Sequence, residues 1–152
     1  MGYNIRVGGA VPDFDTYDFP VLRASWRVEE VNQPDAPVFL HDEGTRNTNS
    51  RYPTYSAWTD FCHATGLFEL FFNADSGLMR AHPGCQGITQ ANVDEVTHAL
   101  RVYREKCGKE PGFEDSEGNL HGKDPQLARL IWLEYWMQWA IANCDIPAID
   151  NS

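Results

Sequence analysis

The segment from residue 125 to about residue 143 constrains the fold most, because it is apolar around nearly its whole circumference. Asp124 can act as the N-cap and Pro125 as the first helical residue, so we expect a helix. This segment contains three of the five tryptophans of the chain: Trp132, Trp136 and Trp139. A helix that is apolar on all sides must be covered on all sides. We therefore predict that it forms the centre of a core, with Trp-lined homodimer contacts as the alternative.

The rest of the pattern predicts two further helices and several short strands, with residues 38–40 as the candidate for the third strand. Apolar and polar residues alternate over residues 3–8 and 22–28, which is typical of strands with one buried face. A helix is expected from near Ser56, capped by Thr54 or Ser56 itself, to Gly66, and another from Thr89 to Gly108. Turn residues at 12–20 and glycines and prolines at 78–87 predict connections. Residues 67–72 predict a buried strand, with continuation of the helix past Gly66 as the alternative.

A chain of 152 residues suits one domain. We find no repeat and no linker that would divide it. The predicted architecture is a single α+β globular domain over residues 1–152, in which a small antiparallel N-terminal sheet packs on about three helices.

The charge is strongly acidic, with 12 Lys and Arg against 22 Asp and Glu, for a net charge of −10. An acidic surface disfavours direct binding to nucleic acid and favours docking on a basic surface of another protein. Acidic residues form three clusters along the chain, and the last is our candidate interaction surface: Glu110, Glu114, Asp115 and Glu117.

The chain shows neither an apolar stretch of signal-peptide length at its start nor a run long enough to span a membrane. Its four cysteines are widely spaced, which favours reduced thiols over disulfides. We therefore expect a cytoplasmic protein.

Two polar segments, residues 41–56 and 78–87, form the candidate ligand site. Arginine binds oxyanions through paired N–H groups, and tyrosine stacks on flat rings, so this composition suits a phosphorylated or nucleotide-like ligand. The candidate residues are Arg46, Asn47, Asn49, Arg51, Tyr52, Tyr55, Arg80 and His82. This hypothesis predicts a pocket that holds the three arginines and the histidine together. We expect Arg51 to be an exposed loop residue that adds little stability. A loop that satisfies its own hydrogen bonds is the alternative.

Two kinds of cysteine chemistry are also considered. A weak zinc hypothesis combines Cys62, His63, His82 and Cys85, but paired Cys-x-x-Cys motifs are missing. Cys85 precedes a predicted helix and His82 is close in sequence, which would suit a reactive thiolate. An incidental loop cysteine is the simpler interpretation. We assign no catalytic residue, no metal and no cofactor.

Three parts of the chain resemble small bacterial and phage proteins to which no activity is attached. These are MGYNIRVG at residues 1–8, NSRYPTYSAWTDFC at 49–62, and LARLIWLEYW with NCDIPAIDNS within 127–152. The resemblance covers most of the chain except residues 109–124. It implies a phage-borne accessory protein, such as an inhibitor of a host defence system.

Two functions therefore remain. The first is a non-catalytic acidic protein that binds a protein partner, such as a bacterial defence or nucleic-acid-handling complex. The second is a protein that binds or hydrolyses a nucleotide-like or phosphorylated small ligand.

Overall fold

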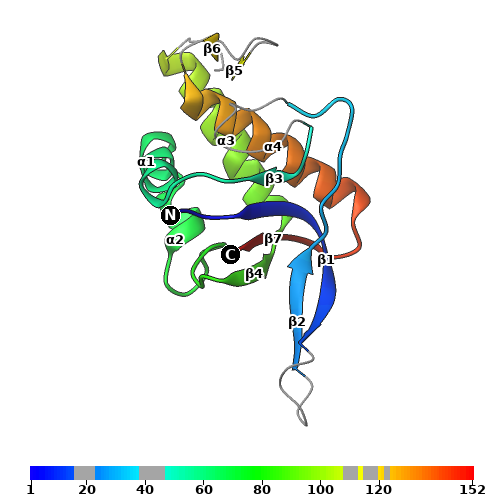
Figure 1. The fold of residues 1–152 in the computed structure, drawn as a ribbon. Coiled ribbons are helices and arrows are strands. Elements are labelled where there is room, and N and C mark those ends of the chain that lie inside the picture. The colour runs from blue at the N-terminus through cyan, green and yellow to red at the C-terminus, as the bar shows by residue number, and fades with distance from the viewer. Residues whose placement is uncertain (16–22, 38–46, 108–112, 115–119, 122–123) are drawn as a thin grey trace.

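The computed structural model describes residues 1–15, 23–37, 47–107, 113–114, 120–121 and 124–152. Within these ranges the chain forms an α+β fold with four helices and a curled antiparallel sheet, which confirms the predicted fold class (Figure 1). In chain order, the elements are β1 Ile5–Asp15, β2 Arg23–Val28, β3 Ser50–Arg51, α1 Tyr55–Thr65, α2 Phe68–Phe72, β4 Gly84–Gly87, α3 Gln90–Cys107, β5 Phe113–Glu114, β6 Leu120–His121, α4 Pro125–Asn143 and β7 Pro147–Asn151.

Helix α4 lies in the core, as predicted. Its N-cap Asp124 accepts hydrogen bonds from the backbone N–H groups of Gln126 (3.0 Å) and Leu127 (3.2 Å). Trp132 and Trp136 have no exposed surface. The helix packs on α3, β1 and β7, and Figure 1 shows α3 and α4 side by side behind the sheet strands. Within the described ranges, no helix is long and apolar enough to cross a bilayer.

The sheet has the strand order β2-β1-β7-β4, with β3 paired to β1. Strand β1 pairs with three other strands, and its two halves have different partners. Its first part, Ile5–Gly9, pairs with β7, and its second part, Ala10–Asp15, pairs with β2. Figure 1 shows the resulting hairpin of β1 and β2 extending away from the helices. Helices cover the face of the sheet that carries buried Ile5 and Val7.

The other two predicted helices are present. Thr54 caps α1 by accepting a hydrogen bond from the Ala57 N–H at 3.1 Å, and Gly66 ends the helix in the left-handed region at φ 74°. Helix α3 starts at Gln90, one residue after the predicted Thr89.

Three predictions of local structure were wrong. Residues 68–72 form helix α2 in place of the predicted strand, and the Phe71 N–H bonds to the carbonyl of Leu67, four residues earlier, at 3.2 Å. Residues 84–87 form β4, because β7 offers it a pairing partner that the sequence analysis did not identify. Strand β1 continues through the predicted turn at 12–15, since β2 pairs with it there. The possible strand at 38–40 lies outside the described residues.

Candidate functional site

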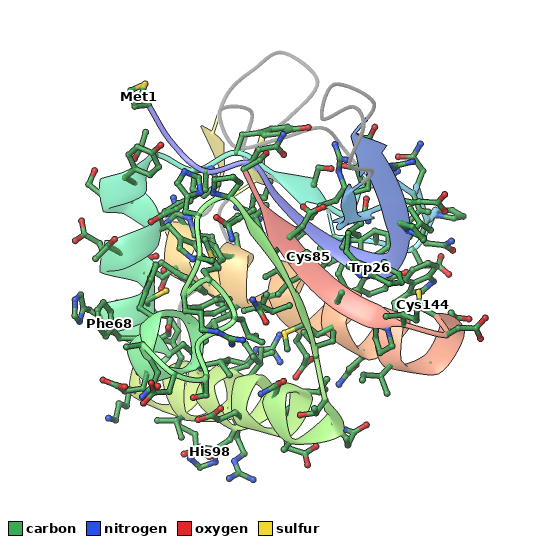
Figure 2. The ribbon with its side chains drawn as sticks, turned by 90° about the horizontal axis from the view of Figure 1, so that it is seen from below. Met1, Trp26, Phe68, Cys85, His98 and Cys144 are labelled. Carbon is green, nitrogen blue, oxygen red and sulfur yellow. The ribbon has the colours of Figure 1, made fainter. Side chains whose placement is uncertain are left out.

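A pocket of about 500 Å³ is hollowed into the face of the sheet that the helices do not cover. Figure 2 shows two of its residues, Trp26 and Cys85, over the sheet, away from the helical residues Phe68 and His98. The pocket is lined by Asn4, Arg6, Trp26, Arg27, Pro83, Gly84, Cys85, Asp150, Asn151 and Ser152.

The floor of the pocket is one cross-strand row. Arg6 on β1 pairs with Asp150 on β7, and Asp150 pairs with Cys85 on β4. Residues directly opposite each other on neighbouring strands project from the same face, so these three side chains lie together. Arg6 donates from Nε to the Ser50 hydroxyl at 2.9 Å and from Nη1 to the Val28 carbonyl at 3.4 Å. These bonds hold the guanidinium in place at the floor.

Asp150 is a half-buried carboxylate whose Oδ2 accepts a hydrogen bond from the Val28 N–H at 2.6 Å. Burial raises the pKa of Asp150, although the Val28 N–H and the Arg6 and Arg27 guanidiniums act in the opposite direction. Among its lining side chains the pocket therefore combines two arginines with one carboxyl group, Asp150, whose charged form is disfavoured by burial. This local balance is opposite to that of the whole chain, which has a net charge of −10.

Cys85 also lies in this row, and its surroundings oppose thiolate formation. Burial, and after it the nearby Asp150 carboxylate, raise the pKa of Cys85 to about 11. A cysteine nucleophile needs the pKa lowered instead. The proximity of Cys85 to His82 in sequence therefore does not produce an activated thiol.

A hydrogen-bonded relay flanks the pocket at Asn151. Asn151 donates from Nδ2 to the Ala81 carbonyl at 3.0 Å, so its Oδ1 is the acceptor for His82 Nδ1, 2.5 Å away. This assignment places the His82 proton on Nδ1 and leaves Nε2 to accept from the Tyr55 hydroxyl at 3.3 Å. Tyr3 packs edge-on against both rings, with centroid distances of 4.7 Å to Tyr55 and 5.0 Å to His82. The relay fixes the backbone that leads into the Pro83–Gly84 wall.

The structure thus brings together one residue from each of the two predicted ligand-binding segments, Tyr55 and His82. It does not gather the predicted arginines. Arg80 is exposed and donates to the Gly77 carbonyl at 3.2 Å, Arg51 faces the core, and Arg46 lies outside the described residues. Of the residues predicted to share a pocket, the three that the structure describes, Arg51, Arg80 and His82, do not line it.

Asn49 is a structural residue. It is completely buried, and its side chain donates to the carbonyls of Val7 (3.0 Å) and Glu29 (2.8 Å) while accepting from the Val31 N–H (2.9 Å). These bonds join β1 to the segment after β2. Every polar atom of the amide is engaged, which leaves it no role toward a ligand.

Arg51 was predicted to be an exposed loop arginine, and this was wrong. It is completely buried, with its guanidinium carbon 5.7 Å from the centre of the Trp132 ring. It pairs with Ile5 across β3 and β1, and this register directs its side chain to the helix-covered face. The neighbouring Tyr52 is 39% exposed, and Asn47 adopts the left-handed conformation at φ 61° with its carbonyl accepting from the Gln33 N–H at 3.0 Å.

The four residues of the zinc hypothesis lie in different environments. Cys62 is fully buried, His63 is exposed and stacks on Phe68, His82 belongs to the relay, and Cys85 lies in the pocket. Within the described part of the chain, no group of three or more His, Cys, Asp or Glu residues could hold a metal ion. The hypothesis fails because the fold separates these side chains.

The acidic candidate surface stays a prediction. Glu110, Asp115 and Glu117 lie outside the described residues, and the side chain of Glu114 is likewise not described.

Sequence reasoning missed the pocket-forming residues Arg6, Trp26, Arg27 and Asp150. The alternation over 3–8 and 22–28 did place Arg6 and Arg27 on polar strand faces. The alternation did not reveal strand β7, which places Asp150 between Arg6 on β1 and Cys85 on β4.

A second hollow of about 470 Å³ lies between the end of α1 and α3. Its charged residues Glu95 and Lys106 are of opposite sign and both exposed. It gives less reason to expect a charged ligand than the sheet pocket does.

Comparisons of the chain with family models, curated proteins and solved structures give no match.

Proposed function

We propose that this protein binds a small organic anion with a flat ring, of the phosphorylated or nucleotide-like class, in the pocket on the sheet. The observation that carries the proposal is the placement of Arg6, Arg27 and a 47% exposed Trp26 around one pocket in a strongly acidic chain. This is the second of the two functions predicted above, with its site moved from the polar loops to the sheet.

Arg6 supplies a fixed anion-binding group. Two of the five N–H groups of its guanidinium are used by Ser50 and Val28, and no described hydrogen bond uses the other three. Because those two bonds already orient the side chain, binding an oxyanion costs little further rotamer entropy. Charge-assisted hydrogen bonds of this kind are stronger than neutral ones.

Trp26 supplies the flat surface. Nearly half of this large apolar side chain is in contact with solvent, on the strand that forms one wall of the pocket. A ring stacked on the indole would remove this area from water, and such stacking contributes about 1–3 kcal/mol in aromatic–base pairs. An anionic head on the arginines and a ring on Trp26 therefore define the ligand class.

The first predicted function, an acidic protein that binds a protein partner, stays a prediction. Phage origin, inhibition of a host defence system, dimer formation and a cytoplasmic location belong with it. The side chains of its candidate interaction surface, Glu110, Glu114, Asp115 and Glu117, are not among those that the structure describes.

Isothermal titration calorimetry with adenosine 5′-monophosphate (AMP) and with phenyl phosphate, at low ionic strength, tests the proposal. Both probes combine a ring with a phosphate, and adenosine serves as the uncharged comparison. We expect Trp26→Ala and Arg27→Gln each to weaken binding of AMP by about tenfold or more, equivalent to about 1.4 kcal/mol. Arg80→Gln removes the same charge from an exposed site outside the pocket and should leave the affinity unchanged. A wild-type protein that binds neither phosphate contradicts the proposed function.

A further inference from the structure

The pocket contains hydrogen-bond acceptors as well as positive charges. The side-chain oxygen of Asn4 is buried and has no hydrogen-bond partner among the described residues. Asn4 is held beside Ser152 by two backbone hydrogen bonds, from Asn4 N–H to the Ser152 carbonyl (3.0 Å) and from Ser152 N–H to the Asn4 carbonyl (3.1 Å). These bonds keep the Asn4 side chain at the end of the pocket.

The second acceptor is Asp150, which lies at the floor of the pocket between Arg6 and Cys85. Only its Oδ2 is engaged by a described hydrogen bond, the one from the Val28 N–H. The remaining lone pairs of the carboxyl group are available to a bound molecule.

A bare anion with a ring does not satisfy these two groups. It leaves the Asn4 oxygen, which is already buried in the unbound protein, without the donor that a bound molecule can supply, and an unsatisfied buried polar atom costs about 1–3 kcal/mol. It also places negative charge near Asp150 without any compensating bond. A ligand that donates hydrogen bonds to both acceptors removes both costs.

The donor groups should be neutral. The Arg6 and Arg27 guanidiniums both line the pocket and both act electrostatically on Asp150, so an ammonium group on the ligand would be repelled by two positive charges. Hydroxyl groups donate without adding charge. A phosphate ester of a sugar combines such hydroxyls with the anionic group that the arginines require.

We infer that the pocket selects phosphate esters that carry free sugar hydroxyls, with Asn4 and Asp150 as the specificity-determining residues that accept hydrogen bonds from those hydroxyls. This inference rests on the proposed function and narrows its ligand class from any ring-bearing organic anion to a sugar phosphate or nucleotide.

The test compares two ligands that differ only in the hydroxyls, AMP and 2′,3′-dideoxyadenosine 5′-monophosphate, by titration calorimetry. We expect AMP to bind about tenfold or more tightly, and Asp150→Asn to reduce this ratio to about twofold or less. The asparagine oxygen of that variant still accepts from the Val28 N–H, so the strand contact is kept. Asp145→Asn, which removes an exposed carboxylate outside the pocket, should keep the wild-type ratio.

Each outcome separates this inference from the proposed function. Equal affinities of the wild-type protein for the two nucleotides overturn the inference and leave the proposed function standing. An unchanged ratio in Asp150→Asn overturns the role of Asp150. If that variant does not fold, Asn4→Ala is used in the same comparison, and a wild-type ratio there overturns the inference. Absence of binding by both nucleotides and by phenyl phosphate overturns the proposed function itself.

Discussion

Asn49 and Arg51 show that residues of a polar sequence segment can be part of the protein core. Both lie in the segment predicted to bind a ligand, and both are completely buried. The amide of Asn49 satisfies three backbone groups, and the guanidinium of Arg51 lies against the Trp132 ring. Local composition cannot distinguish such residues from ligand-binding ones, because their orientation depends on the strand that β3 pairs with.

Arg51→Ala should destabilise the fold, because it removes a large buried side chain and its contact with Trp132. We expect a loss of about 2–4 kcal/mol in the free energy of unfolding, the range for large-to-small changes in cores. Urea unfolding followed by circular dichroism measures this loss. Arg80→Ala, at an exposed position, should change stability by no more than about 0.5 kcal/mol. Equal small effects in the two variants would show that Arg51 is not packed as described.

Asp150 should couple stability to pH. Because burial raises its pKa above the ordinary value of 3.8, the folded protein keeps this proton at pH values where the unfolded chain has lost it. Unfolding then releases a proton, so the Asp150 contribution is fully present below the ordinary value and is lost as pH rises through the raised pKa.

The measurable form of this prediction is a difference between proteins. The free energy of unfolding of the wild type, minus that of Asp150→Asn, should decrease as pH rises from about 3.8 into the mildly acidic range. Subtracting the variant removes the contributions of the other carboxylates. A difference that increases over this interval would mean that the Arg6 and Arg27 guanidiniums outweigh burial.

At the scale of elements, the helices depend on signals that lie within their own sequences. Thr54 and Asp124 cap α1 and α4, and Gly66 ends α1. A cap is recognisable because it concerns neighbouring residues only, which explains why these helices could be predicted nearly to their ends. Strands β4 and β7 carry no comparable local signal, since β4 forms by pairing with β7, and β7 by pairing with β1 and β4.

The start of α4 makes a specific prediction. Asp124 accepts from two backbone N–H groups and from the Tyr103 hydroxyl, at 2.8 Å and 3.0 Å to its two oxygens. Asp124→Ala removes the cap and the α3 contact together, and we expect a loss of about 2–3 kcal/mol in the free energy of unfolding. Tyr103→Phe removes only the hydroxyl contact and should cost about 1 kcal/mol. Chemical denaturation of both variants tests this order, and an equal cost would mean that the cap itself contributes nothing.

At the scale of the whole molecule, a feature could be predicted when the residues that form it are close in sequence, and could not when they are far apart. The α+β class and the central α4 helix were predicted, because apolar periodicity and alternation act over short stretches of chain. The pocket was not, because its floor joins residue 6, residue 85 and residue 150. Only the pairing of β1, β7 and β4 brings those positions into one row, and this pairing cannot be derived from the composition of any single segment.

The same long-range packing predicts that the described core unfolds as one unit. Its buried residues come from strands and helices along the chain, including Ile5 on β1, Phe61 on α1, Val96 on α3, Trp136 on α4 and Ile149 on β7. Loss of any of these elements would expose apolar surface on the others, so partly unfolded states are unfavourable. Tryptophan fluorescence reports the core around α4, and far-ultraviolet circular dichroism reports all helices. We expect their urea transitions to coincide in midpoint and slope. Two separated transitions would instead divide the chain into independently stable parts and contradict the prediction of a single domain.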